Sequence, residues 1–261
     1  MPYFIGFAIA LFIALTRVGA GTITVPVLVL FLNVPAAIAV GIGLTFSAVV
    51  KAILTPAQIA NGNVAWRTLG FMLLGGVPGV LLGSLLLRGM VTAGSENVLN
   101  AILGAILVGT ASWQIIYSFR PMQAKRENRD RSPLLSWLMF PVGAEVGFSS
   151  AGAGALGSAA LLTLTPLEPA QVVGTDILFG FTISLLGAGA HWLAGTAKIA
   201  HGGAPELLLR LIAGGIFGAI AGTLLSKRVP RRPLRFAMWV WLLVLGGDFL
   251  LNSYQVWAAT H

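Results

Sequence analysis

The sequence predicts an all-α membrane protein, a polytopic helical bundle made of two repeats of inverted topology. Three observations predict it. Of the 261 residues, 57% are hydrophobic and only 9% are Asp, Glu, Lys or Arg, whereas soluble domains carry roughly 25% charged residues. Apolar stretches long enough to cross a bilayer as helices recur from one end of the chain to the other. The third observation is an internal duplication.

Eight apolar segments succeed one another, four in each half of the chain. They cover 3–33, 36–60, 68–88 and 97–119, and then 134–165, 170–196, 207–226 and 236–258. Many of the 33 glycines lie inside these segments, as expected where membrane helices pack closely. We therefore expect a first membrane repeat at 1–120, a basic cytoplasmic linker at 121–132 and a second repeat at 133–261.

The duplication is visible as a constant spacing between similar motifs. A glycine-rich motif that begins at Arg17 is matched by one that begins at Ser150, a shift of 133 residues, and Val40-Gly41 is matched by Val173-Gly174 at the same shift. Further on, the glycine motif at 75–79 is matched at 214–218, a shift of 139. Each half therefore repeats the same order of segments.

The first segment of each half is long and interrupted by glycines: Gly19 and Gly21, and then Gly147, Gly152 and Gly154. A single crossing by this segment would place the basic loops 120–131 and 227–235 on opposite faces, against the positive-inside rule. A re-entrant or hairpin segment places both loops in the cytoplasm and both termini outside. Inverted repeats with broken helices are an architecture of secondary transporters, whose sites lie near the midplane of the bilayer.

The two breaks predict a central anion site. A helix that begins near Thr22 directs free N–H groups and the positive end of its dipole toward the break. An intramembrane cation such as Lys51 normally faces a partner or a cavity, although snorkelling to an interface is the alternative. The predicted substrate-binding residues are Arg17, Lys51, Gly19, Gly21, Thr22, Thr45, Ser47, Ser149, Ser150 and Thr175.

Three further polar residues are candidates for coupling or charge pairing. Glu145 and Asp176 flank the second break in sequence, where they either neutralise the nearby cations or carry a coupling proton. His191 is the candidate pH sensor because its ordinary pKa lies close to neutrality. A packing role is the alternative interpretation for this histidine.

Composition also excludes several classes of function. The absence of cysteine excludes disulfides and thiolate metal sites, and no arrangement of nucleophile, base and orienting group is visible. We therefore expect no enzyme activity, metal or cofactor. The net charge of +8 lies mainly in loops between apolar segments, so the expected partners are a small anion and the lipid bilayer rather than nucleic acid. The oligomeric state, a homodimer included, stays open.

Three sequence runs carry a resemblance to a known family: TRVGAGTITVPVLVLFLNVPAAIAVGIGL, GNVAW and LLGGVPGVLLGSLLLR. They resemble the TauE/SafE family of sulfite and organosulfonate exporters, 4-toluenesulfonate uptake permeases included. The second half departs from the family pattern at Ala159, at Gly174-Thr175-Asp176 and at 195–198. The resemblance implies transport of sulfite or a sulfonate across a bacterial inner membrane. Export is the direction favoured by an inside-negative potential, and proton-coupled import is the alternative.

Overall fold

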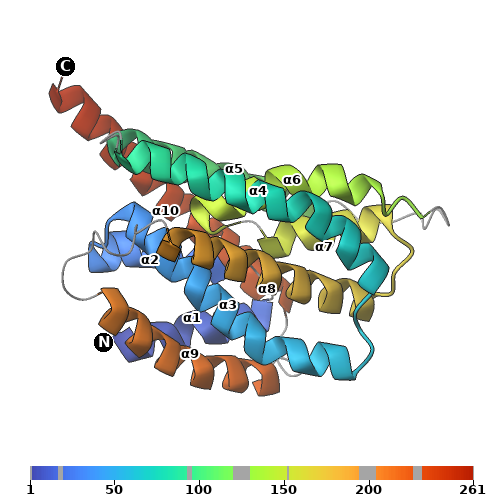
Figure 1. Ribbon diagram of the computed structural model, residues 1–261. Helices are drawn as coiled ribbons and strands as arrows, with labels where there is room; N and C mark the ends of the chain where they lie inside the picture. The colour runs from blue at the N-terminus through green and yellow to red at the C-terminus, as the bar shows by residue number, and fades with distance from the viewer. Residues whose placement is uncertain are drawn as a thin grey trace.

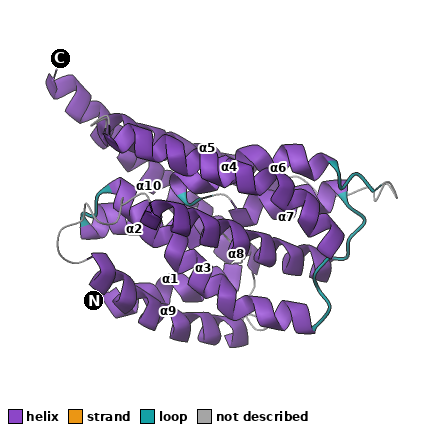
Figure 2. Cartoon of the chain, in the orientation of Figure 1, coloured by secondary structure: helices purple, strands orange, loops and turns teal. Residues whose placement is uncertain are grey.

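The protein is a bundle of α-helices. The computed structural model describes residues 2–16, 20–92, 96–119, 130–151, 153–193, 204–225 and 231–260. In this described part of the chain the helices are α1 (Pro2–Thr16), α2 (Ala20–Leu32), α3 (Ala36–Ala60), α4 (Trp66–Thr92), α5 (Glu96–Phe119), α6 (Leu134–Ser149), α7 (Ala153–Leu164), α8 (Pro169–Leu193), α9 (Ala204–Leu225) and α10 (Arg231–Thr260). Figure 2 shows helices and loops over these ranges and no strand.

Six of the described helices are long and apolar enough to cross a membrane: α3, α4, α5, α8, α9 and α10. Their outer faces carry large apolar side chains such as Leu74, Phe217 and Leu251, which are exposed by 60% or more. Such a surface is stable against lipid and unstable against water. The predicted all-α, polytopic membrane bundle is confirmed.

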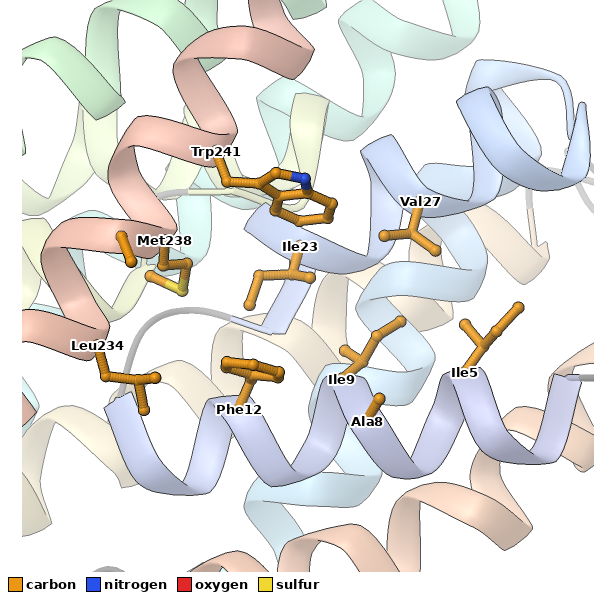
Figure 3. A pocket seen from close by; sticks show the side chains of 10 residues that line it. Ile5, Ala8, Ile9, Phe12, Ile23, Val27, Leu234, Met238 and Trp241 are labelled. Carbon is orange, nitrogen blue, oxygen red and sulfur yellow. The ribbon is translucent and has the colours of Figure 1, made fainter. Parts of the chain in front are cut away.

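The long first segment of each half forms two short antiparallel helices. In the second half, the Arg131 N–H donates to the Leu164 carbonyl oxygen at 3.0 Å, so α6 begins at the same end of the bundle at which α7 ends. In the first half, Figure 3 shows Ile23 and Val27 of α2 running back along Ile9 and Ile5 of α1. Helices of 12 to 16 residues span only about 18 to 24 Å. These helices are therefore shorter than the hydrocarbon core, which is about 30 Å thick.

The break between α6 and α7 is a local change of backbone conformation at Ser150. Its φ of 61° is left-handed, a conformation that ends helices. The Ala151 N–H donates to the Ser149 hydroxyl at 3.1 Å rather than continuing the helix, so the Gly147 carbonyl loses its helical donor. Glycines expected at the breaks, Gly21, Gly147 and Gly154, lie inside the flanking helices α2, α6 and α7.

The tightest helix pairs join one half of the chain to the other. α4 packs along α6, and α1 packs along α9. A Cβ added to Gly79 of α4 would collide with the Phe140 carbonyl oxygen of α6, and one added to Gly218 of α9 would collide with the Phe7 carbonyl oxygen of α1. These residues are related by the shifts of 133 and 139 found in the sequence. The two pairs are therefore equivalent contacts. In each pair, the first helix segment of one half packs against the third segment of the other half.

The equivalent helices α3 and α8 cross in opposite directions. Successive residues of α3 meet residues of α8 in reverse order: Gly41 with His191, Leu44 with Gly187, Ser47 with Ser184 and Lys51 with Gly180. The equivalent helices α5 and α10 also cross in opposite directions, since Gly104 of α5 packs against Phe249 of α10 and Gly246 packs against Val108. Figure 1 shows α1 beginning and α10 ending at the same side of the bundle. This arrangement is consistent with the expected inverted repeats.

We predict that Gly79→Ala lowers thermal stability. The new methyl group would force α4 away from the α6 backbone, and such overpacking typically costs about 1–3 kcal/mol of the free energy of unfolding. Gly70→Ala is the matched control, because it lies on the same helix and a Cβ there meets no atom within 4 Å. Thermal unfolding of the purified protein in detergent measures both. Equal midpoints for the two variants would contradict the close helix contact.

Candidate functional site

A line of polar side chains is buried where α3 crosses α8. Its members are Ser47, Lys51 and Thr55 on α3 and Asp176, Ser184 and His191 on α8, each exposed by 7% or less. The four-residue spacing on α3 places its three members on one face of the helix. We call this set the α3–α8 seam. Polar residues inside a membrane bundle are costly and typically mark the path of a substrate or ion.

Lys51 is the cation of the seam. It lies in the central part of α3, and its Nζ is 3.5 Å from the Ser184 hydroxyl. That hydroxyl is in turn 3.1 Å from the hydroxyl of Ser47. Among the described residues Lys51 forms no ion pair with a carboxylate. Its ammonium therefore keeps donors that the protein does not use.

Asp176 is the acid of the seam. It lies one turn before Gly180 on α8 and interacts with Lys51 by Coulombic attraction without reaching ion-pair contact. Its Oδ2 accepts a hydrogen bond from the Ser158 hydroxyl of α7 at 2.6 Å. Its Oδ1 packs against Gly157 and has no hydrogen-bond partner within the described residues. Asp176 is therefore held between α7 and α8 with one carboxylate oxygen unpaired.

His191 satisfies the backbone at the second break. The Nε2–H of His191 donates to the Gly147 carbonyl oxygen at 2.9 Å, which is the carbonyl that the break deprives of its helical donor. The Ser84 hydroxyl of α4 approaches the same oxygen at 3.5 Å. A membrane interior offers no water to solvate such a group. This contact supports the packing role of His191, while pH sensing stays a prediction.

The N-terminal turn of α2 abuts the break of the opposite half. A Cβ at Gly21 would collide with the Ser150 backbone and hydroxyl oxygens. The Ser150 hydroxyl is also 3.1 Å from the Cβ position of Gly43, one turn before Ser47 on α3. It is buried and has no hydrogen-bond partner in the described part of the chain. The break of the second half therefore adjoins the α3 side of the seam.

Two other predicted hydroxyls, those of Thr45 and Ser149, already form hydrogen bonds within the protein. Thr45 donates to the Gly41 carbonyl at 2.8 Å and accepts from the Trp192 indole N–H at 2.9 Å. Ser149 donates to the Glu145 carbonyl at 2.9 Å, and Thr22 is buried with 3% exposure.

Of the remaining predicted residues, the structure describes Glu145 but not Arg17 or Gly19. Glu145 Oε1 is buried and has no hydrogen-bond partner among the described residues. Arg17 and Gly19 lie outside the described residues. The structure therefore brings Lys51 together with Ser47, and Gly21 together with Ser150. Substrate contact by any of these residues stays a prediction.

The GNVAW motif contacts the start of α8, where the sequence departs from the family pattern. The Ala65 N–H, at the start of α4, donates to the Thr175 hydroxyl at 2.9 Å. A Cβ at Gly174 would collide with the Asn63 carbonyl oxygen. The 61–66 turn, which needs a left-handed Gly62 with φ of 67°, is thus fixed on the start of α8. This contact joins the two halves.

Sequence reasoning missed Gly180, Ser158 and the role of Ser184. Ser184 was identifiable only as the repeat mate of Lys51, and Gly180 is the mate of Ser47 at the same shift of 133 residues. Because helix direction is needed to know which mates meet, spacing alone did not place them together. Ser158 carries no sequence signal that we recognise.

A cavity of about 410 Å³ lies away from the seam, between α1, α2 and α10. Figure 3 shows its lining, which includes Ile5, Phe12, Ile23 and Trp241. The lining is apolar throughout, so this cavity supplies no charge or hydroxyl for binding an anion. It does not extend the candidate site.

The fold and the seam define a membrane transporter. The chain belongs to the sulfite exporter TauE/SafE family, whose model matches residues 3–249. The probable membrane transporter protein YjnA of Bacillus subtilis (strain 168) is 27% identical over 217 residues, covering 79% of this chain and 82% of that relative. No solved structure matches the chain significantly.

We predict that His191→Leu destabilises the protein more than His191→Gln does. Leucine leaves the buried Gly147 carbonyl with only the distant Ser84 hydroxyl at 3.5 Å, and a poorly satisfied buried carbonyl typically costs about 1–3 kcal/mol. Glutamine keeps an N–H donor and is the residue at the equivalent position, Gln58. Thermal unfolding of both variants in detergent tests this. If both variants unfold at the same temperature, the histidine does not support the break.

Proposed function

We propose that this transporter exports a small sulfur-containing oxyanion, such as sulfite or an organosulfonate, by alternating access around the α3–α8 seam. The observation that carries the proposal is the state of Lys51. It is 7% exposed, lies in the central part of a membrane-spanning helix and forms no ion pair among the described residues. A buried cation of this kind is stabilised by an anion.

The neighbours of Lys51 suit an oxyanion. The hydroxyls of Ser47 and Ser184 lie beside its ammonium, so several donors are available to oxygens bonded to one sulfur atom. Charge-assisted hydrogen bonds of this type are roughly twice as strong as neutral ones. The description of the matched family supports sulfite as the anion. The name of the Bacillus relative supports transport but gives no substrate.

The second break supports the same site from the other side. The N-terminal turn of α2 adjoins Ser150, whose hydroxyl has no partner within the described residues. Helix N-termini attract anions through their free N–H groups and their dipole. With Arg17 as a predicted additional ligand, this turn would receive an anion that leaves Lys51.

Direction follows from charge. An inside-negative membrane potential drives a monovalent anion outward with about 2.3 kcal/mol per 100 mV. Export therefore needs no coupling ion. Proton-coupled import is favoured by a different observation, the unpaired Oδ1 of Asp176 near Lys51. Glu145 and His191 are the other candidates for carrying that proton.

The orientation that fits both proposals places the basic loops 120–131 and 227–235 in the cytoplasm of a bacterial cell and both termini outside the inner membrane. The repeats at 1–120 and 133–261 are then inverted. The opposite directions of α3 and α8, whose starts lie at opposite ends of the bundle, support the inversion of the repeats.

We predict that cysteines introduced at Asn33 and Glu168 are labelled from opposite sides of the membrane. Both residues are exposed and precede equivalent helices, and the chain has no cysteine of its own. Membrane-impermeant maleimide should label N33C in intact spheroplasts and E168C only in inside-out vesicles. Labelling of both positions from one side would rule out the inverted topology.

We predict that Lys51→Met lowers sulfite flux at least about tenfold, since losing a hydrogen bond to a charged group costs about 1.5–3 kcal/mol. Flux is measured in proteoliposomes under a set potential, with and without a proton gradient. Arg210→Gln is the control, because Arg210 pairs with Glu206 on an exposed face. Unchanged flux in Lys51→Met contradicts the proposal. Flux that requires the proton gradient and is lost in Asp176→Asn indicates coupled import instead.

A further inference from the structure

Equivalent positions of the two halves carry different chemistry at the centre of the seam. The shift of 133 residues relates Ser47 to Gly180 and Lys51 to Ser184. Because α3 and α8 cross in opposite directions, these four residues meet: Ser47 lies against Ser184, and Lys51 lies against Gly180. All four are buried. One half therefore supplies the charge, and the other supplies a hydroxyl and an empty position.

The empty position at Gly180 is filled by Lys51. A Cβ added to Gly180 would collide with Lys51 Nζ, and it would lie 3.0 Å from Cε and 3.4 Å from Cδ of the same side chain. The three nearest atoms thus all belong to the outer part of one flexible side chain. A methyl group at this position would displace the ammonium rather than the backbone of a neighbouring helix.

The Ser184 hydroxyl defines where the ammonium lies. Among the described residues, it is the one hydroxyl within reach of both Lys51 Nζ, at 3.5 Å, and Ser47 Oγ, at 3.1 Å. If the ammonium moved toward α3, it would leave this hydroxyl. Two residues of α8 therefore determine where the Lys51 ammonium lies. Gly180 leaves space for it, and the Ser184 oxygen accepts its hydrogen bond.

We propose that Gly180 is a positioning residue of the anion site and that Ser184 is a substrate-binding residue. Because Gly180 has no side chain, Lys51 Nζ can lie beside Ser184. The ammonium and the hydroxyls of Ser47 and Ser184 then converge on the oxygens of one oxyanion. This inference rests on the proposed function. It adds that the affinity of the site for a sulfur oxyanion depends on a position that bears no functional group.

The test measures KM and Vmax for sulfite and for 4-toluenesulfonate in proteoliposomes, together with thermal stability. Gly180→Ala is expected to raise KM at least about tenfold, the size of a lost charged hydrogen bond, with unchanged thermal stability and little change in Vmax. The control is Gly189→Ala on the same helix, where a Cβ meets no atom within 4 Å. Its KM is expected to equal that of the unchanged protein.

Ser184 is tested by a matched pair of variants. Ser184→Ala is expected to raise KM, and Ser184→Thr, which keeps the hydroxyl, is expected to restore it. Thr182→Val controls for removal of a hydroxyl from α8, because Thr182 donates only to its own helix at Leu178. If Gly180→Ala does not insert into the membrane, the Ser184 pair alone decides the proposal.

The outcomes separate this inference from the proposed function. The inference is overturned, and the proposed function stands, if Lys51→Met loses transport while Gly180→Ala keeps its KM and the two Ser184 variants have equal KM values. Unchanged transport in Lys51→Met overturns both. A higher KM in Gly180→Ala also overturns the inference if the thermal unfolding temperature of the same variant falls, because a packing defect would then explain both changes.

Discussion

The bilayer interior provides no water for unpaired polar groups, and this constraint determines most of the architecture. The first segment of each half forms a pair of short helices, and the described break between α6 and α7 leaves a backbone carbonyl without its helical donor. In the second half, the Gly147 carbonyl is satisfied by His191 from α8 and approached by Ser84 from α4. The break can exist only because helices from both halves surround it. The same enclosure makes room for a buried Lys51.

Glycine allows these helices to come close enough. Membrane helices gain no hydrophobic driving force from one another, so they associate through close packing of small residues. At Gly79 and Gly218 the neighbouring backbone occupies the place of a side chain. At Gly180 the occupant is instead the end of Lys51. The same residue type thus serves the packing of the bundle at two positions and the arrangement of a polar site at the third.

Much of the fold could be predicted from the sequence, because hydropathy, basic loops and a repeat shift are properties of the chain itself. The hairpin of the first segment followed from the placement of the arginine-rich loops, and the structure contains it. The position of the break could not be predicted to the residue, since Ser150, which carries no glycine signal, takes a left-handed conformation there. The site was predicted as a list of polar residues near the breaks. Which of them meet depends on the antiparallel crossing of α3 and α8, so Ser184 and Gly180 were missed.

The exchanged pairing of α4 with α6 and of α1 with α9 has a consequence for biogenesis. When α1 enters the membrane, its partner α9 is still some two hundred residues from being synthesised. Contacts between such distant parts of a chain form late. During translation the first hairpin must therefore remain in lipid, or beside an insertion factor, with the face of α1 that packs against the α9 glycines uncovered. The bundle is complete only when the last helices have been inserted and pack against the first.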